Sequence, residues 1–136
     1  MGFIFAAIEA PWDAAIYYTI GIPSSIAAAV FYCLILHRGW AAVQDGQART
    51  TPGKAVGFGF VPFFNLYWVF VSHYGLLKEF NRAATTYARP GAQVTAGFGL
   101  TLSILSVIPY VNIFALPFTI VFVWQILGAV RDLEKA

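Results

Sequence analysis

The sequence predicts an all-α integral membrane protein, and three observations lead to this fold class. Of the 136 residues, 60% are hydrophobic and only 10% are charged, whereas a soluble domain carries about 25% charged residues. Long uncharged stretches cover residues 16–36, 55–77 and 94–130, and a helix needs ~20 apolar residues to cross the hydrocarbon core. The charged residues gather in the segments between and after these stretches. We therefore expect residues 1–136 to form a single membrane domain surrounded by lipid.

The N-terminal part predicts an interfacial segment followed by one spanning helix. Residues 1–15 are apolar with few charges, and Trp12 is a suitable anchor at the membrane interface. This segment lacks the basic start of a cleaved signal peptide, so we expect it to be retained. Residues 16–37 form the predicted span, with Pro23 tolerated at the entry and the regular helix beginning near Ser24.

The next uncharged stretches predict two helical hairpins, over residues 51–81 and 92–131. Thr51 followed by Pro52 is a helix start, with a side-chain cap and then proline at the first helical position. Pro62 interrupts the first stretch at its middle and predicts a turn there. A helix from Thr51 to Val61 is about 16 Å long and too short to cross the bilayer. We therefore expect the first hairpin to be partly re-entrant.

An internal repeat supports the two hairpins. GFGF at 57–60 precedes PFFNLY at 62–67, and GFGL at 97–100 precedes PYVNIF at 109–114. This order predicts equivalent turns, in which an asparagine amide bonds the backbone groups that proline leaves free. The small residues predict close helix packing. The residues with these predicted roles are Pro62, Asn65, Pro109 and Asn112 at the turns, and Gly57, Gly59, Gly97, Gly99 and Ser103 at the helix contacts.

The charge distribution favours hairpins over a single kinked span. With two hairpins, all eight basic residues lie on one face of the membrane. If residues 55–77 crossed the membrane once, three basic residues would lie on one side and five on the other. The positive-inside rule favours the first arrangement. We expect a multi-pass protein of the bacterial inner membrane, with its N-terminus outside and its C-terminus in the cytoplasm.

The run TTPGKAVGFGFVPFFNLYWVF at 50–70 is similar to a known family. It resembles an uncharacterised bacterial multi-pass membrane domain that often follows a small GYF-like domain in longer proteins. The resemblance covers the chain from Arg38 to Arg82. It implies an integral membrane domain with no established activity.

Two histidines are the candidate cofactor ligands. His37 ends the predicted span and His73 lies in an apolar helix, so the pair is a candidate for binding haem, and His73 alone for a pigment. A buried histidine more often bonds a neighbouring helix. The uncharged stretches contain no carboxylate, and the chain has no catalytic motif, which argues against an enzyme. The sequence assigns no cofactor.

The abundance of aromatic residues suggests partners within the membrane. Aromatic residues make up 18% of the chain, and Trp12, Trp40 and Trp124 fall where an interfacial belt is expected. The remaining aromatics exceed what so small a bundle can bury. The net charge is +2, without the basic cluster that nucleic-acid binding requires. We expect the lipid bilayer and other membrane proteins as partners.

Three functions follow from these residues. The first is a non-catalytic accessory or assembly subunit of a larger respiratory or photosynthetic membrane complex. The alternative is a protein that binds haem, a pigment or a small ligand through His73. A third is a small carrier that uses Asn65 and Asn112 at the breaks of its hairpins.

Overall fold

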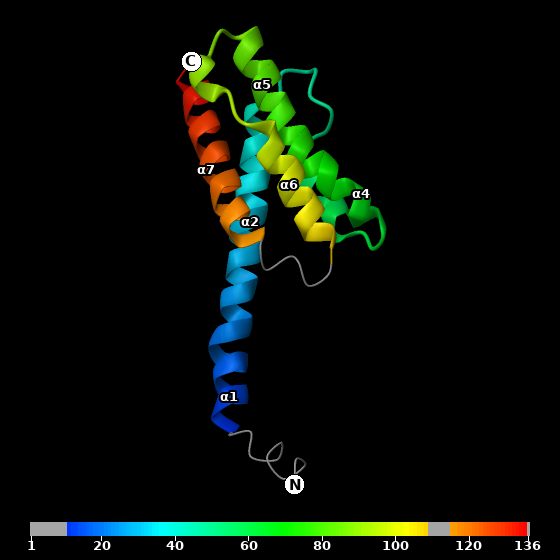
Figure 1. Ribbon diagram of the computed structural model, residues 1–136, viewed down its shortest axis with the longest axis vertical. Coiled ribbons are helices and arrows are strands. Elements are labelled where there is room, and N and C mark those ends of the chain that lie inside the picture. The colour runs from blue at the N-terminus through cyan, green and yellow to red at the C-terminus, as the bar shows by residue number, and fades with distance from the viewer. Residues whose placement is uncertain (1–10, 109–114, 136) are drawn as a thin grey trace. The chain divides into compact units, whose positions relative to one another are not determined.

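The computed structural model describes residues 11–108 and 115–135, and over these residues it is helical with no strand (Figure 1). Its contacts divide the chain into two compact units, Met1–Cys33 and Leu34–Ala136. The division has a simple physical cause. Between residues 14 and 33 no side chain is buried, whereas buried side chains recur throughout the second unit.

In the first unit, a wide turn lets the helix continue through Pro23. Helix α1 covers Pro11–Ile16, the π-helical turn η2 covers Tyr17–Gly21, and α2 covers Ile22–Ala42. The amide of Ile22 bonds the carbonyl of Tyr17, five residues back, which widens the helix just before the proline. The hydroxyl of Ser25 donates to the Gly21 carbonyl at 2.7 Å. The helix therefore begins before Ser24, and α2 also passes the expected end at His37.

Two helical stretches are long and apolar enough to cross a membrane. They are Ala14–Ala42, with 29 residues, and Ala115–Glu134, with 20 residues. The assignment rests on length and composition, and it covers the described residues only. The first stretch includes the span predicted at residues 16–37.

In the second unit, the chain folds back on itself at Pro62. Helix α3 covers Pro52–Gly57, the 3₁₀ turn η3 covers Phe58–Phe60, and α4 covers Phe64–Phe70. The predicted helix start is confirmed, because the Thr51 hydroxyl accepts from the Lys54 amide and Pro52 is the first helical residue. The arms are joined by the Trp68 indole, which donates to the Ala55 carbonyl at 3.0 Å.

The returning arm is one long helix with a wide turn in its middle. After α4, the π-helical segment η4 covers Val71–Gly75 and α5 covers Leu76–Thr86. The helix ends with Ala88 at a φ of 53°, a left-handed conformation that favours glycine. There the Arg89 amide bonds the Ala84 carbonyl at 2.8 Å. This bond and the left-handed conformation of Ala88 close the helix with a Schellman turn.

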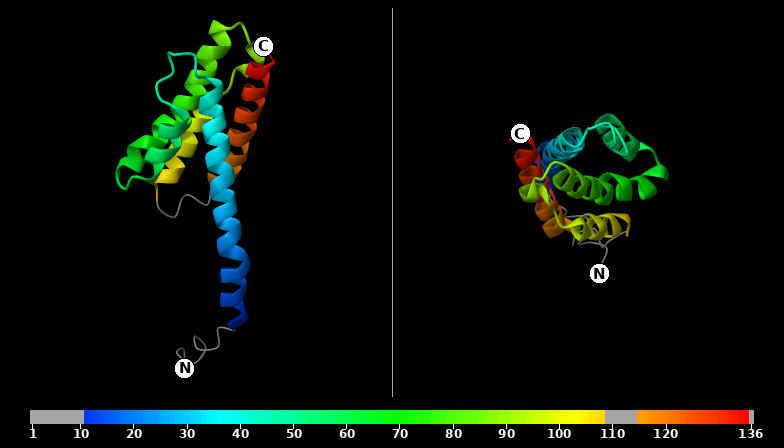
Figure 2. Two further views of the ribbon diagram at one scale, coloured as in Figure 1. Left: turned by 180° about the vertical axis from the view of Figure 1, so that it is seen from behind. Right: turned by 90° about the horizontal axis from the view of Figure 1, so that it is seen from above.

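The last two helices pack against each other and against the long helix. The 3₁₀ turn η5 covers Pro90–Ala92, α6 covers Ala96–Val107, and α7 covers Ala115–Glu134. Helix α6 contacts α7, η4 and α4, and Figure 2 shows the same helices from two further directions. The turn predicted at Pro109 and Asn112 lies outside the described residues.

The core of the second unit lies where the last turns of α2 meet α5 and α7. Gly39 permits this approach, since an added Cβ would lie 3.0 Å from the Leu76 side chain and 3.1 Å from that of Ile126. Trp40 is fully buried here, so its indole packs within the protein. Trp12 and Trp124 are exposed.

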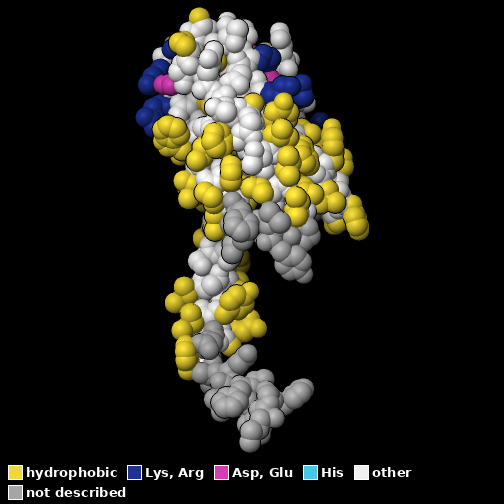
Figure 3. Space-filling model, in the orientation of Figure 1, with side chains coloured by type: hydrophobic (Ala, Val, Ile, Leu, Met, Phe, Trp, Pro, Cys, Tyr) yellow, Lys and Arg dark blue, Asp and Glu magenta, His cyan; other side chains and the backbone are white. Residues whose placement is uncertain are grey.

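Charged side chains gather toward one end of the second unit. On the face that Figure 3 shows, Lys and Arg side chains lie near that end and hydrophobic side chains cover the surface below them. An ion pair of 3.2 Å between Arg38 and Glu134 joins the ends of α2 and α7. A second pair of 2.7 Å, between Arg82 and Asp45, joins α5 to the loop after α2.

Candidate functional site

Four polar side chains lie in or against the π-helical segment η4, and we call them the π-turn cluster: Trp40, Ser72, His73 and Ser103. A π-turn shifts backbone hydrogen bonds to a spacing of five residues, so side chains bond carbonyls along it. The Val69 carbonyl lies 2.7 Å from Nδ1 of His73 and 3.3 Å from Oγ of Ser103. The Trp40 indole donates to the Ser72 carbonyl at 3.2 Å. The cluster therefore binds α2, α4 and α6 to the wide turn.

The two candidate histidines lie in different surroundings. His73 is buried, with its ring centroid 5.1 Å from that of Phe122. His37 is exposed and lies off the face of α2 that carries the buried Leu36 and Trp40. The structure therefore turns only His73 toward the core. Over residues 11–108 and 115–135, no group of three His, Cys, Asp or Glu side chains could hold a metal ion.

Close helix packing occurs at one of the four predicted glycines. An added Cβ on Gly99 would lie 3.0 Å from the His73 carbonyl oxygen. At Gly57, Gly59 and Gly97 it would meet no described atom within 4 Å. The next turn of α6 brings Ser103, which is fully buried and donates to the Gly99 carbonyl at 2.7 Å. Gly99 thus lies against η4, and Ser103 bonds the Val69 carbonyl at the end of α4.

At the first turn, the hydrogen bonds that the structure shows come from backbone amides. Asn65 is exposed, and backbone amides close the turn at Pro62. The Phe64 amide bonds the Pro62 carbonyl at 2.7 Å, and the Asn65 amide bonds the Val61 carbonyl at 2.9 Å. The corresponding prediction for Asn112 falls outside the described residues.

A charged cluster lies at the other end of the long helix. It consists of Asp45, Arg49, Glu79 and Arg82. The Arg82 guanidinium holds both oxygens of Asp45, at 2.7 and 3.0 Å, and donates through Nε to Glu79 at 2.6 Å. Glu79 is buried, and Arg49 lies 3.5 Å from its other oxygen. Two positive and two negative charges therefore balance each other.

Hydrogen bonding shifts the pKa values within this cluster. The Arg82 guanidinium, assisted by the Gln47 amide, holds the pKa of the Asp45 carboxyl well below its usual range. The hydrogen bonds from Arg82 to Asp45 and Glu79 raise the pKa of the guanidinium. Asp45 therefore stays ionised at neutral pH, and the cluster holds the loop after α2 against α5.

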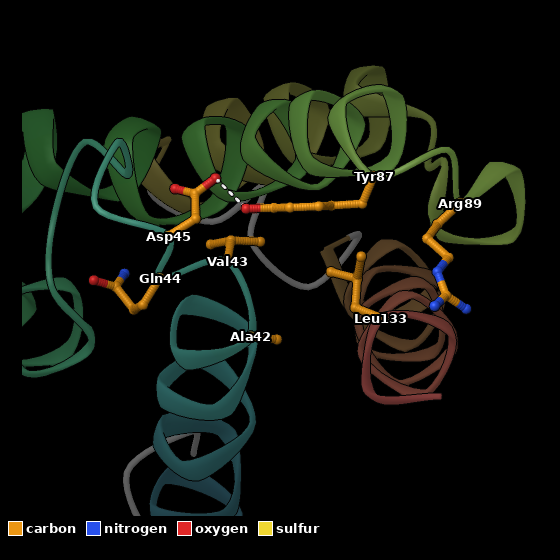
Figure 4. Close-up of a pocket in the computed structure, with 7 residues that line it drawn as sticks. All are labelled: Ala42, Val43, Gln44, Asp45, Tyr87, Arg89 and Leu133. Atoms are coloured by element: carbon orange, nitrogen blue, oxygen red, sulfur yellow. Dashed lines mark hydrogen bonds between the residues drawn. The ribbon is translucent and has the colours of Figure 1, made fainter. Parts of the chain in front are cut away.

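A cavity of about 340 Å³ adjoins the charged cluster. Figure 4 shows Asp45 and Tyr87 across it, joined by a hydrogen bond of 3.3 Å from the tyrosine hydroxyl. Ala42, Val43 and Leu133 supply apolar walls. Because Asp45 also accepts bonds from Arg82, this arrangement fixes the loop after α2.

Sequence reasoning missed the residues that fasten these polar regions. Glu79 and Arg82 are three residues apart on a helix, a spacing that indicates a pair, but Asp45 is distant in sequence. Asn81 is a further residue whose partner is distant in sequence. The side-chain nitrogen of Asn81 donates to the Val94 carbonyl at 2.9 Å, and its side-chain oxygen accepts from the Val94 backbone amide at 2.8 Å. These two bonds fix the start of α6. Only the tertiary fold reveals these long-range partners.

Comparison of the chain with protein-family models, with curated proteins and with solved structures finds no match in any of the three.

Proposed function

We propose that the chain is a multi-pass protein of the bacterial inner membrane, acting as a non-catalytic accessory or assembly subunit of a larger membrane complex. The observation that carries this proposal is the uncovered apolar surface of the helical stretch Ala14–Ala42. Between residues 14 and 33 it buries no side chain, and Tyr18, Ile26 and Phe31 are all exposed. In a bilayer, these side chains face acyl chains or helices of other proteins.

The gathering of charge at one end of the second unit supports the orientation. The turn at Pro62 belongs to the uncharged part of the first hairpin, whereas the charged cluster joins α5 to the loop after α2. This distribution suits hairpins that enter from the cytoplasmic side, where basic residues are favoured. The C-terminus then lies in the cytoplasm and the N-terminus outside.

Site-specific photocrosslinking in cells tests the accessory role. A photoreactive phenylalanine analogue at Phe31 is expected to give a discrete adduct with one membrane protein, since this side chain is exposed on the span. The same analogue at Phe122, which is fully buried, is the matched control and should give no intermolecular adduct. The accessory role is abandoned if Phe31 and other exposed span positions yield only lipid adducts.

The alternative function at His73 has its own test. The burial of His73 beside Phe122 and its place in a π-turn favour this candidate, because π-turns often occur at functional sites. If His73 binds haem or a pigment, the purified protein shows an absorption band that His73→Ala removes and His37→Ala retains. A colourless preparation from cells that make the cofactor would contradict this alternative.

A further inference from the structure

We infer that the second unit acts as a wedge in the cytoplasmic leaflet and favours membrane that is convex toward the cytoplasm. This inference rests on the proposed membrane location and goes beyond the accessory role. It starts from the depth of the first hairpin. The outgoing arm, Pro52 to Phe60, is about 15 Å long, and the returning arm from Phe64 to the last residue before Lys78 is about 21 Å. The hydrocarbon core is ~30 Å thick, so this hairpin ends near the midplane.

The outgoing helix of the second hairpin is also shorter than the hydrocarbon core is thick. Helix α6 has 12 residues, which corresponds to about 18 Å. It packs along η4 and α4, so it runs beside the first hairpin. The described part of α6 therefore stays within roughly the same depth as its neighbour.

The turn of the first hairpin is built for a hydrocarbon environment. Phe63 is 89% exposed, and Phe60 on the preceding 3₁₀ turn is 74% exposed. Phe63 also has a φ of 61°, and the bond from the Phe64 amide to the Pro62 carbonyl closes a tight γ-turn around it. Such a turn is strained. A large apolar side chain at a strained, projecting position is stabilised when acyl chains surround it.

The consequence is an imbalance in area between the two leaflets. A helix occupies about 80 Å² in cross-section. Helix α7 has 20 residues and is long enough to cross both leaflets, so it adds equal area to each. The arms α3–η3 and α4, together with α6, therefore add about 240 Å² to the cytoplasmic leaflet alone. Short elements that end near the midplane add little to the opposite leaflet. A membrane relieves this imbalance by becoming convex on the side whose leaflet carries the extra area.

Sorting between flat and curved membrane tests the wedge. The full chain, with Cys33→Ser and Lys135→Cys, is placed in giant phospholipid vesicles and labelled from outside with a dye that does not cross the membrane. Only molecules with their charged end outward become fluorescent. Thin tubes are then pulled from the vesicles. We expect these molecules to be enriched on the tubes at least ~2-fold relative to a lipid dye. Equal density on tube and vesicle would overturn the inference.

A depth measurement tests the same premise without curvature. A nitroxide on Phe63→Cys, in the Cys33→Ser background, is expected to lie near the bilayer midplane. A label in the opposite headgroup region would show that the hairpin spans, and the wedge would be wrong. The variant Tyr18→Ala, in the separate first unit, is the matched control and should sort like the parent. If the protein is not enriched on the tubes but Phe31 still forms its protein crosslink, the wedge is refuted and the accessory role stands. If the protein is enriched on the tubes but Phe31 forms no protein crosslink, the accessory role is refuted and the wedge stands.

Discussion

Gly99 lets the backbones of α6 and η4 approach closely, because glycine has no side chain. The nearest atom to an added Cβ is the His73 carbonyl oxygen at 3.0 Å, which cannot move without shifting the π-turn. Overpacking of this kind costs about 1–3 kcal/mol. Gly97 lies one half-turn earlier in the same helix and has no described neighbour within 4 Å of an added Cβ.

We predict that Gly99→Ala lowers the free energy of unfolding by about 1–3 kcal/mol. Gly97→Ala is expected to leave it unchanged or raise it by up to ~1 kcal/mol, because alanine favours helix. Denaturant titrations in detergent, followed by circular dichroism, measure both. Equal effects of the two variants would show that α6 does not pack on η4 as described.

Ala88 offers a prediction of the opposite sign. It has a φ of 53° at the end of α5, and a left-handed conformation costs a non-glycine residue about 1–2 kcal/mol. Ala88→Gly should therefore raise the free energy of unfolding, by about 0.5–1 kcal/mol after the greater chain entropy of glycine is counted. The same titration checks it, with the exposed helical Ala41→Gly as a control that should destabilise.

At the scale of elements, the charged cluster holds the loop after α2 against α5. Its effect on stability depends on pH through Asp45, whose folded-state pKa lies below the usual value. A lowered pKa means that ionised Asp45 stabilises the fold above about pH 4 and that this stabilisation is lost as the pH falls below it. Between pH 6 and 8, Asp45 contributes a constant amount.

We predict that the melting temperature falls as the pH decreases from 5 to 3, and that Asp45→Asn makes this fall smaller. At pH 7 the variant should melt below the parent, because Arg82 and the buried Glu79 lose part of a balanced cluster. Arg38→Gln is the comparison variant. It removes an ion pair whose side chains are 64% and 53% exposed, and such pairs contribute only about 0–1 kcal/mol to the free energy of unfolding. An identical acid response in parent and Asp45→Asn would refute the assignment.

The elements show what could be predicted from sequence. Thr51 and Pro52 mark a helix start because capping is local, and Pro62 marks a break because proline removes an amide. The packing of Trp40 could not be foreseen, since its indole bonds a carbonyl that only the π-turn presents. The closure of the turn at Pro62 by backbone amides could not be read from the residue types, because asparagine at position 65 also suits a turn. The partners of Glu79 and Asn81 depend on the tertiary arrangement.

For the molecule as a whole, we propose that every charged loop of the second unit faces one side of the membrane. The loop after α2 contains Gln47 and the end of α5 contains Thr86, and both residues are exposed. If residues 55–77 crossed the bilayer once, these two positions would lie on opposite sides. With a re-entrant hairpin they lie together in the cytoplasm.

Cysteine labelling in cells measures this directly. In a Cys33→Ser background, Gln47→Cys, Thr86→Cys and Lys135→Cys are treated with a maleimide that cannot cross the inner membrane. The re-entrant arrangement predicts that all three stay unlabelled in intact spheroplasts and react after the membrane is opened. Reaction of one loop but not the other in intact spheroplasts would contradict it.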